Sequence, residues 1–487
     1  MTTKKKITAF ITLFLLVGSA VFAAEKVITV DCLQSIGEIK PLHGINLGPL
    51  CYRGTIDLSK YHRELKIPYT RLHDVVYQSE DAVDISTIFR DFRNPADDPA
   101  SYDFRITDDY LQAIINTGSK IIYRLGESIE HTPRKYRVNP PPDFEKWADV
   151  CVRIISHYNE GWANGFHHNI EYWEIWNEPD VKPAMWTGTD EQFFRLFEIT
   201  AKKIKSAHPK VKVGGPALGN PVMNENSNPQ PTPYLANFLS YCRQHNVPLD
   251  FFSWHCYTSE PQVIAAKARA VRQILDNYGF TKTESHFNEW NYLPRNDWSP
   301  MLGDNPYVKA KWYDEMGGPD GAVFLATVLI LLHDLKVDVA NFYTGIVHCF
   351  GLFDCYGAPK KVYFAMKAFS KMLDTPVRLK ATGSPAEFYV LSGMNMAKNT
   401  INILVPAKIK TPETISFSVV NLPWKGKSKV GFYLVDKDKN LDLTDSKIID
   451  TKPSDSNGNE PAQPLQFQFQ VQSPSVLLIT ITPEDKK

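Results

Sequence analysis

The sequence has no excess of charge of either sign, because 54 basic residues balance 54 acidic residues among 487. A chain without a basic surplus lacks the electrostatic footprint of a nucleic-acid-binding protein, and this balance does not indicate an acidic partner surface. We therefore expect no nucleic-acid partner and a substrate that is not a polyanion.

Cysteine is scarce and scattered, with seven residues in the whole chain: Cys32, Cys51, Cys151, Cys242, Cys256, Cys349 and Cys355. These are too few for a disulfide scaffold, and their spacing fits no zinc pattern. Cys349 and Cys355 could bridge a loop, although a buried free thiol is the commoner state. Because the sequence also contains no nucleotide-binding loop, we expect neither a metal site nor a cofactor.

An apolar run, ITAFITLFLLVGSAVFA, follows three lysines at the start of the chain and ends in small residues. This order of charged, apolar and small residues is typical of a secretory signal. We expect residues 1–23 to be a cleaved signal peptide, which makes the mature protein secreted or periplasmic without stable membrane insertion. An uncleaved run that anchors the protein to a membrane is the alternative.

Short β-rich segments alternate with longer amphipathic segments over residues 32–375, which is typical of a parallel α/β architecture. Eight such units favour a closed (β/α)8 TIM barrel over an open sheet. The predicted strands are PLHGINL near 41, PYTRLHD near 68, KIIYRLG near 120, IEYWEIWN near 170, KVGGPAL near 212, DFFSWHCY near 250, ESHFNEW near 284 and VANFYTGI near 339.

The pattern changes after residue 375 to short runs in which apolar and polar residues alternate, as in TINILVP and LQFQFQV. We expect residues 376–487 to form a C-terminal antiparallel β-sandwich domain. The segment KVITVD at 26–31 could add a strand to it.

Two glutamates each follow an apolar run typical of a buried strand and are each preceded by asparagine: Glu178 in WNEP and Glu289 in FNEW. They end the fourth and seventh predicted strands, so both are expected at the rim formed by the carboxyl ends of the barrel strands. Hydrolysis of a glycosidic bond needs one carboxylic acid and one carboxylate, which this pair supplies. Either residue alone would more simply be a solvated loop acid.

The two motifs resemble clan A of the retaining glycoside hydrolases, and a barrel followed by a β-sandwich is most similar to glycoside hydrolase family 39. That family includes β-xylosidases and α-L-iduronidases. The resemblance implies that Glu178 is the general acid/base and Glu289 the nucleophile. It also implies that Asn177 bonds the sugar 2-hydroxyl.

Further positions match the clan's pattern. Tyr257 resembles its tyrosine that bonds the nucleophile, and His255 a sugar-binding histidine. Arg71 matches an arginine beside the nucleophile, and His73 lies on the same side of its strand. His43 resembles a first-strand histidine that touches the sugar. Each histidine could equally have a purely structural role.

Aromatic residues near the acids are candidates for sugar stacking, Trp290 first among them. Glu174, four residues before Glu178, is expected to be a structural partner of Arg71. The iduronidase branch carries a lysine near the position of Tyr257, and its absence here favours a neutral sugar.

These observations predict a retaining glycoside hydrolase that is exo-acting on an oligosaccharide or glycoside with a neutral sugar, such as a xyloside or arabinopyranoside. The rival interpretation is a secreted carbohydrate-binding protein that keeps the barrel but has lost catalysis.

Overall fold

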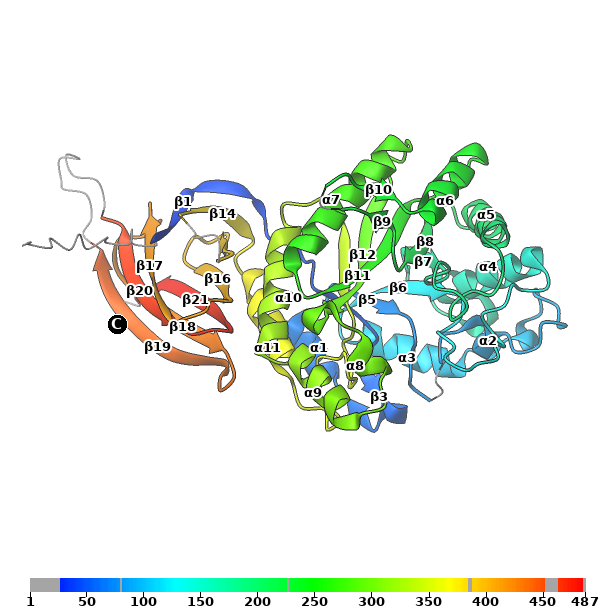
Figure 1. The fold of residues 1–487 in the computed structure, drawn as a ribbon, viewed down its shortest axis with the longest axis horizontal. Coiled ribbons are helices and arrows are strands. Elements are labelled where there is room, and N and C mark those ends of the chain that lie inside the picture. Colours follow the sequence, from blue (N-terminus) through cyan, green and yellow to red (C-terminus); the bar gives the residue numbers. More distant parts are fainter. Residues whose placement is uncertain (1–26, 79–80, 226, 384–387, 452–462, 485–487) are drawn as a thin grey trace, which may run out of the picture.

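The computed structural model describes residues 27–78, 81–225, 227–383, 388–451 and 463–484. The predicted signal peptide, residues 1–23, lies outside the described residues. A barrel and a β-sheet domain lie side by side, with β1 leading from the sheet domain to the barrel (Figure 1).

The larger part is a closed barrel of eight parallel strands in the order β11-β12-β13-β2-β5-β6-β7-β8. This confirms the predicted (β/α)8 barrel. The strands are β2 (Gly44–Asn46), β5 (Tyr69–Leu72), β6 (Lys120–Leu125), β7 (Tyr172–Ile175), β8 (Lys212–Leu218), β11 (Phe251–Thr258), β12 (Glu284–Tyr292) and β13 (Val339–Phe342).

A helix follows each barrel strand and covers its outer face. These helices are α1 (Ser59–Leu65), α3 (Arg105–Ile115), α4 (Phe144–Glu160), α5 (Asp190–Ala207), α6 (Pro233–Gln244), α7 (Pro261–Asn277), α10 (Pro319–Leu332) and α11 (Lys361–Met372). Local sequence sets their starts: Thr189 and Gln192 form a capping box before α5, and Pro233 begins α6 behind the N-cap Thr232.

The βα loops carry further strands and helices. These are β3 (Leu50–Cys51), β4 (Ile56–Asp57), α2 (Ile85–Ile88), β9 (Val222–Met223), β10 (Gln230–Pro231), α8 (Ser299–Leu302) and α9 (Pro306–Gly317). In a barrel of this kind these loops gather at the carboxyl ends of the strands, where binding sites form.

The inside of the barrel is apolar at the amino-terminal end of the strands and polar above. Ile122, Tyr172, Phe251 and Val339 form a small buried cluster there, one from each of four strands. Above it lie the fully buried Arg71 and Glu174. The interior is therefore a packed core whose charged layer faces the loops.

The second part is a nine-stranded sheet in the order β19-β18-β21-β16-β15-β14-β1-β17-β20. Its strands are β1 (Val27–Glu38), β14 (Val377–Thr382), β15 (Leu391–Met394), β16 (Ile401–Ala407), β17 (Glu413–Val420), β18 (Gly426–Val435), β19 (Asn440–Thr451), β20 (Leu465–Val471) and β21 (Ser475–Pro483). The sheet curls so that its two ends meet: the rings of Phe432 on β18 and Phe467 on β20 are 5.7 Å apart. This is the sandwich-like arrangement expected from the sequence.

The pairing within this sheet differs from the prediction at one place, because β1 and β17 run parallel. Strands joined by short turns must be antiparallel, whereas β1 is separated from β17 by the whole barrel and is free of that constraint. β1 also continues to Glu38, beyond residue 32, where we placed the start of the barrel segment.

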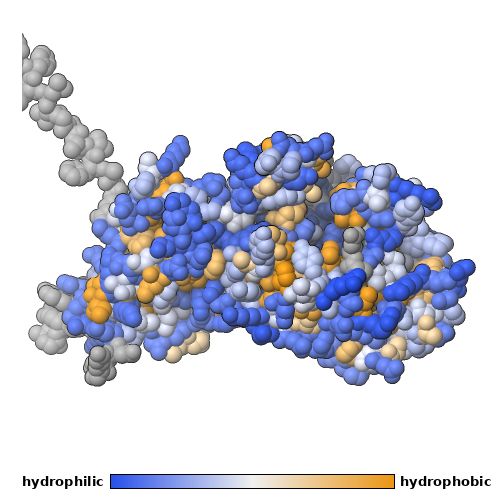
Figure 2. Space-filling view, turned by 90° about the horizontal axis from the view of Figure 1, so that it is seen from below, coloured by the Kyte–Doolittle hydropathy of each residue, from blue (hydrophilic) through white to orange (hydrophobic). Residues whose placement is uncertain are grey.

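The face of the molecule seen in Figure 2 is mostly hydrophilic, and its hydrophobic residues form small, separate patches. In the described residues, no single helix has the length and composition to cross a membrane. The bent pair α9 and α10 meets that criterion only when taken together. All seven cysteines, including Cys349 and Cys355, are free.

Candidate active site

A cavity of about 800 Å³ opens at the carboxyl ends of the barrel strands. Residues from several βα loops line it, among them His73, Glu178, Tyr257, Glu289 and Trp298. Its volume lies within the range typical of small-ligand sites. Four of the nine predicted site residues, His73, Glu178, Tyr257 and Glu289, therefore line one cavity.

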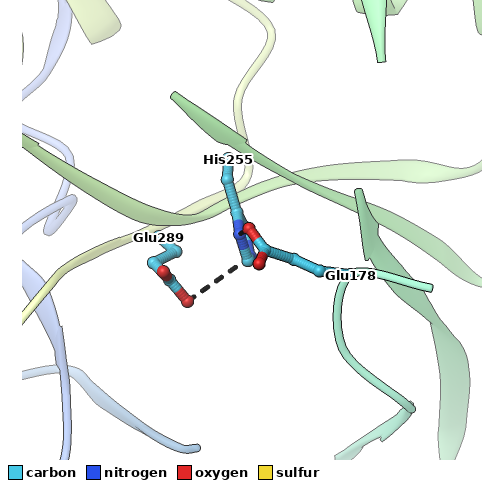
Figure 3. Close-up of side chains that lie close together, drawn as sticks. All are labelled: Glu178, His255 and Glu289. Atoms are coloured by element: carbon cyan, nitrogen blue, oxygen red, sulfur yellow. Dashed lines mark hydrogen bonds and ion pairs between the residues drawn. The ribbon is translucent and has the colours of Figure 1, made fainter. Parts of the chain in front are cut away.

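The two predicted glutamates approach each other inside it from different strands. Glu178 lies three residues beyond the end of β7, while Glu289 lies within β12. One carboxylate oxygen of each is within 4.8 Å of the other, and both lie within the same distance of a nitrogen of His255. Figure 3 shows the imidazole beside the two carboxylates.

The backbone at Glu178 adopts a left-handed conformation, with φ of 44°. Such a conformation is strained for a residue with a side chain and is found preferentially at functional sites. Its amide donates a hydrogen bond to the carbonyl of Ala217 at the neighbouring strand, 3.1 Å away. The chain therefore holds this carboxylate at the rim in spite of the strain.

Glu289 is surrounded by groups that stabilise its charged form. The hydroxyl of Tyr257 donates to Oε1 at 2.6 Å, and Nη1 of Arg71 donates to Oε2 at 3.2 Å. Burial raises the pKa of Glu289, and the charge of Glu178 adds to this rise. His255, Arg71 and Tyr257 oppose it. Glu289 is thus buried but provided with a cation and a hydroxyl donor.

Glu178 has a different environment. Its Oε1 lies 2.7 Å from Nδ1 of His255. Burial raises the pKa of Glu178 to about 8, and the nearby charges of Asp180 and Asp74 act in the same direction, against Arg71. At neutral pH this carboxyl group is therefore mainly protonated, whereas Glu289 has a cation and a hydroxyl donor that favour its charged form.

Arg71 connects the polar side chains below the cavity. Its Nε donates to Glu174 at 2.7 Å, which confirms the predicted pairing of these two residues. Its Nη2 donates to Oδ1 of Asn177 at 2.6 Å, and its Nη1 to Oδ1 of Asn46 at 3.0 Å. These bonds fix the guanidinium plane, and with it the position of Glu289.

Asn46 and Asn288 belong to this network, although sequence reasoning missed both. Asn46 donates to the carbonyl of Asn288 at 2.9 Å, and the side chain of Asn288 donates to Glu174. The position of Asn288 directly before Glu289 was visible as a motif. Its hydrogen bond to Glu174, 114 positions away, could not be read from the sequence.

His73 lines the cavity and lies 3.3 Å from Asp74, another cavity residue that the sequence did not single out. Burial lowers the pKa of His73 well below its usual range, and the charges of Arg124 and Arg71 contribute. A neutral imidazole here can donate a hydrogen bond to a sugar hydroxyl or accept one from it.

Two predicted sugar-binding residues lie elsewhere, so their assignments are corrected. His43 precedes β2, and its Nε2 bonds the carbonyl of Leu65 at 2.9 Å beside the ring of Phe369. Trp290 is fully buried, with its ring 5.2 Å from that of Phe342. Successive residues of a strand face opposite sides, so Trp290 faces the helices while Glu289 faces the cavity.

Glu178, His255 and Glu289 also have the donor spacing that a metal ion would need. Arg71, however, already lies against Glu289. A metal ion bound by Glu289 would be close to this fixed guanidinium, and like charges at short range repel. The arrangement therefore favours carboxylate chemistry over metal binding.

The chain is similar in sequence to a family of known enzymes. Residues 28–405 match the model of the glycosyl hydrolases family 39. A curated β-xylosidase of Geobacillus stearothermophilus is 27% identical over 262 residues, 49% of each chain. A β-xylosidase of Caldicellulosiruptor saccharolyticus is 24% identical over 339 residues, 65% of this chain and 64% of that one. The matches thus span about half to two thirds of the curated relatives' length.

A solved glucosidase from Croceicoccus marinus has the same fold, with a TM-score of 0.78, 24% identity and coverage of 95% of this chain and 99% of that one. The family match covers most of the chain and includes the whole barrel with both rim glutamates. The chain therefore belongs to the glycosyl hydrolases family 39, as its glutamate motifs and its domain order together predicted.

Proposed function

We propose that this protein is a retaining glycoside hydrolase, with Glu178 as general acid/base and Glu289 as nucleophile. The observation that carries the proposal is the pair of carboxyl groups, Glu289 buried and Glu178 partly buried, within 4.8 Å of each other in one cavity. Retaining enzymes place these groups about 5–5.5 Å apart, whereas inverting enzymes need about 6.5–9.5 Å to admit a water molecule between them. The spacing here favours direct attack on the sugar.

The reaction then has two steps. In the first, an oxygen of Glu289 attacks the anomeric carbon while Glu178 gives its proton to the departing glycosidic oxygen. In the second, Glu178 takes a proton from water, which attacks the same carbon and releases Glu289. Once Glu289 is esterified its charge is gone, so the pKa of Glu178 falls and the residue can act as a base.

The environments support this division of roles and oppose the reverse. Arg71 and Tyr257 stabilise a charged Glu289, as a nucleophile requires. The raised pKa of Glu178, about 8, keeps a proton available for the leaving group. Asn177, held by Arg71, is the proposed partner of the sugar 2-hydroxyl.

For the substrate we propose a neutral sugar, a xyloside or arabinopyranoside, released from the end of a short oligosaccharide. Two curated relatives are named β-xylosidases. The negative charges of Glu289 and Asp74 would disfavour a uronate carboxylate on the reacting sugar. On the evidence of the N-terminal sequence, we propose that the enzyme acts outside the cytoplasm, in the periplasm or medium.

The test is covalent labelling with 2-fluoroxylosyl fluoride followed by mass spectrometry of peptides. We expect a mass increase on the peptide that contains Glu289. Glu289→Gln should abolish the labelling, and Glu145→Gln, a change of an exposed acid on α4, should leave it unchanged. Labelling of another residue would contradict the roles assigned here.

Turnover separates this proposal from the rival binding protein. The enzyme should hydrolyse 4-nitrophenyl glycosides of pentoses, and Glu178→Ala should reduce hydrolysis of poor leaving groups far more than that of 2,4-dinitrophenolate, which needs no proton. A protein that binds these sugars without any turnover would be a carbohydrate-binding protein.

A further inference from the structure

Lys267 is buried in an unusual place. It lies on the inward face of α7, with an exposed fraction of 7%, between Ile264 and Val271 on the same face. Lysine is almost never buried to this extent unless an acid pairs with it. Among the residues that the structure describes, its ammonium group hydrogen-bonds the thiol of Cys256 and forms no ion pair with a carboxylate.

Lys267 lines the cavity of the two glutamates, next to Cys256. Burial raises the pKa of the Cys256 thiol, the Lys267 ammonium opposes that rise, and the charge of Glu225 adds to it. The other long basic side chain that lines the cavity, Arg137, is paired with Asp81. Within the described residues, Lys267 is therefore the lysine or arginine of this cavity that forms no ion pair, and Glu225 acts on the same thiol only through its charge.

The position of Lys267 in the cavity determines which part of a bound substrate its ammonium group could contact. Gly219, also in the cavity wall, directly follows β8 and lies next to Glu178. A Cβ on this glycine would be 3.1 Å from Oε1 of Glu178. The hairpin of β9 and β10 comes next and packs against α7, which carries Lys267. Lys267 is thus on the side of the cavity formed by the loop after β8, the loop whose Gly219 meets Glu178.

An acid that protonates the departing oxygen faces the leaving group. We propose that Lys267 forms an anion-binding subsite for that leaving group, which carries a carboxylate or a sulfate. This inference rests on the role proposed for Glu178. It agrees with a neutral reacting sugar, because the negative charge belongs to the departing unit and lies beyond Glu178.

The subsite explains why an ammonium group is kept in a mostly buried position. An anionic substituent would supply the close ion pair that the ammonium group does not form within the protein, in a cavity where low polarity strengthens the attraction. A neutral leaving group would leave the ammonium unpaired. We therefore expect preference for the anionic ligand to depend on the charge of residue 267.

Binding of thioglycosides tests this without relying on turnover. The three compounds are 4-carboxyphenyl 1-thio-β-D-xyloside, its methyl ester and the matching 4-sulfophenyl compound, titrated by calorimetry into the full chain. A hydrogen bond to a charged group contributes about 1.5–3 kcal/mol, so the carboxylate should bind about 10- to 150-fold more tightly than the ester. Comparison of carboxylate with sulfonate shows which anion fits.

Lys267→Met should remove the preference while leaving the affinity of the methyl ester unchanged, and Lys267→Arg should retain part of it. Lys182→Met is the matched control, because that lysine follows Glu178 closely in sequence but pairs with Asp190 at the surface. Equal binding of ester and carboxylate by the wild type, or an unchanged preference in Lys267→Met, would overturn the proposal.

The same proteins tested with 4-nitrophenyl β-D-xyloside keep the two proposals apart. Loss of turnover with a preserved anion preference would overturn the catalytic proposal alone. Turnover without any preference for the anionic thioglycosides would overturn the anion subsite alone.

Discussion

The hydroxyl of Tyr257 donates a short, buried hydrogen bond of 2.6 Å to Glu289, and its removal by Tyr257→Phe gives a sharp test of the site. A donor to a charged oxygen contributes about 1.5–3 kcal/mol. Its loss should change the ratio of charged to protonated Glu289 by about 10- to 150-fold. Arg71 remains bonded to the other oxygen, so the lower part of this range is expected.

The sign follows from which form the bond stabilises. Tyr257 lowers the pKa of Glu289 by bonding its charged form, so the variant should have a higher pKa at that residue. The nucleophile must be charged, and the acidic limb of kcat/KM against pH should therefore move to higher pH. The assay is hydrolysis of a 4-nitrophenyl glycoside across a series of buffers.

Tyr241→Phe is the matched control, because its hydroxyl also donates at 2.6 Å to a carboxylate, that of Glu198. Glu198 pairs with Lys202 on α5 and lies away from the cavity residues. The control should leave the pH profile unchanged. An acidic limb that stays in place or moves to lower pH in Tyr257→Phe would refute the assignment of Glu289.

Two further predictions concern the proposed acid and the layer beneath the cavity. Because the pKa of Glu178 is about 8 and the acid must be protonated, kcat/KM should fall above about pH 8. Asp180→Asn removes a charge that raises the pKa of Glu178, so the basic limb of kcat/KM against pH should move to lower pH. A basic limb that does not move would contradict the effect assigned to Asp180. Glu174→Gln breaks the buried pair with Arg71 and should cost about 3–5 kcal/mol in urea unfolding. The exposed Glu145→Gln should cost less than about 1 kcal/mol, and similar losses would contradict the buried-pair argument.

The barrel and its rim acids were predictable because their signals are local. Each strand is a short buried run, and parallel strands of a barrel all end at the same face, so two acids at strand ends share a rim without knowledge of any contact. The assignment of Glu174 to Arg71 followed from the alternation of β7 in the same way. The alternation of β12 also carried the signal that Trp290 and Glu289 face opposite sides.

Other features had no local signal. His43 and His73 stand in similar apolar contexts, yet His43 precedes its strand and bonds Leu65, while His73 reaches the cavity. Lys267 reads in the sequence as one charge among several on an amphipathic helix. Its burial depends on the angle at which α7 packs against the barrel, which no short pattern encodes.

By itself, then, the sequence determined that the chain forms a barrel with two glutamates at one rim, because periodicity and strand ends are properties of neighbouring residues. The tertiary structure alone decided which carboxyl group keeps its proton and which basic side chain stays unpaired. Burial and electric field at an atom are sums over groups that the fold brings from distant parts of the chain, as Arg71, Tyr257 and Asp180 are brought to these two acids.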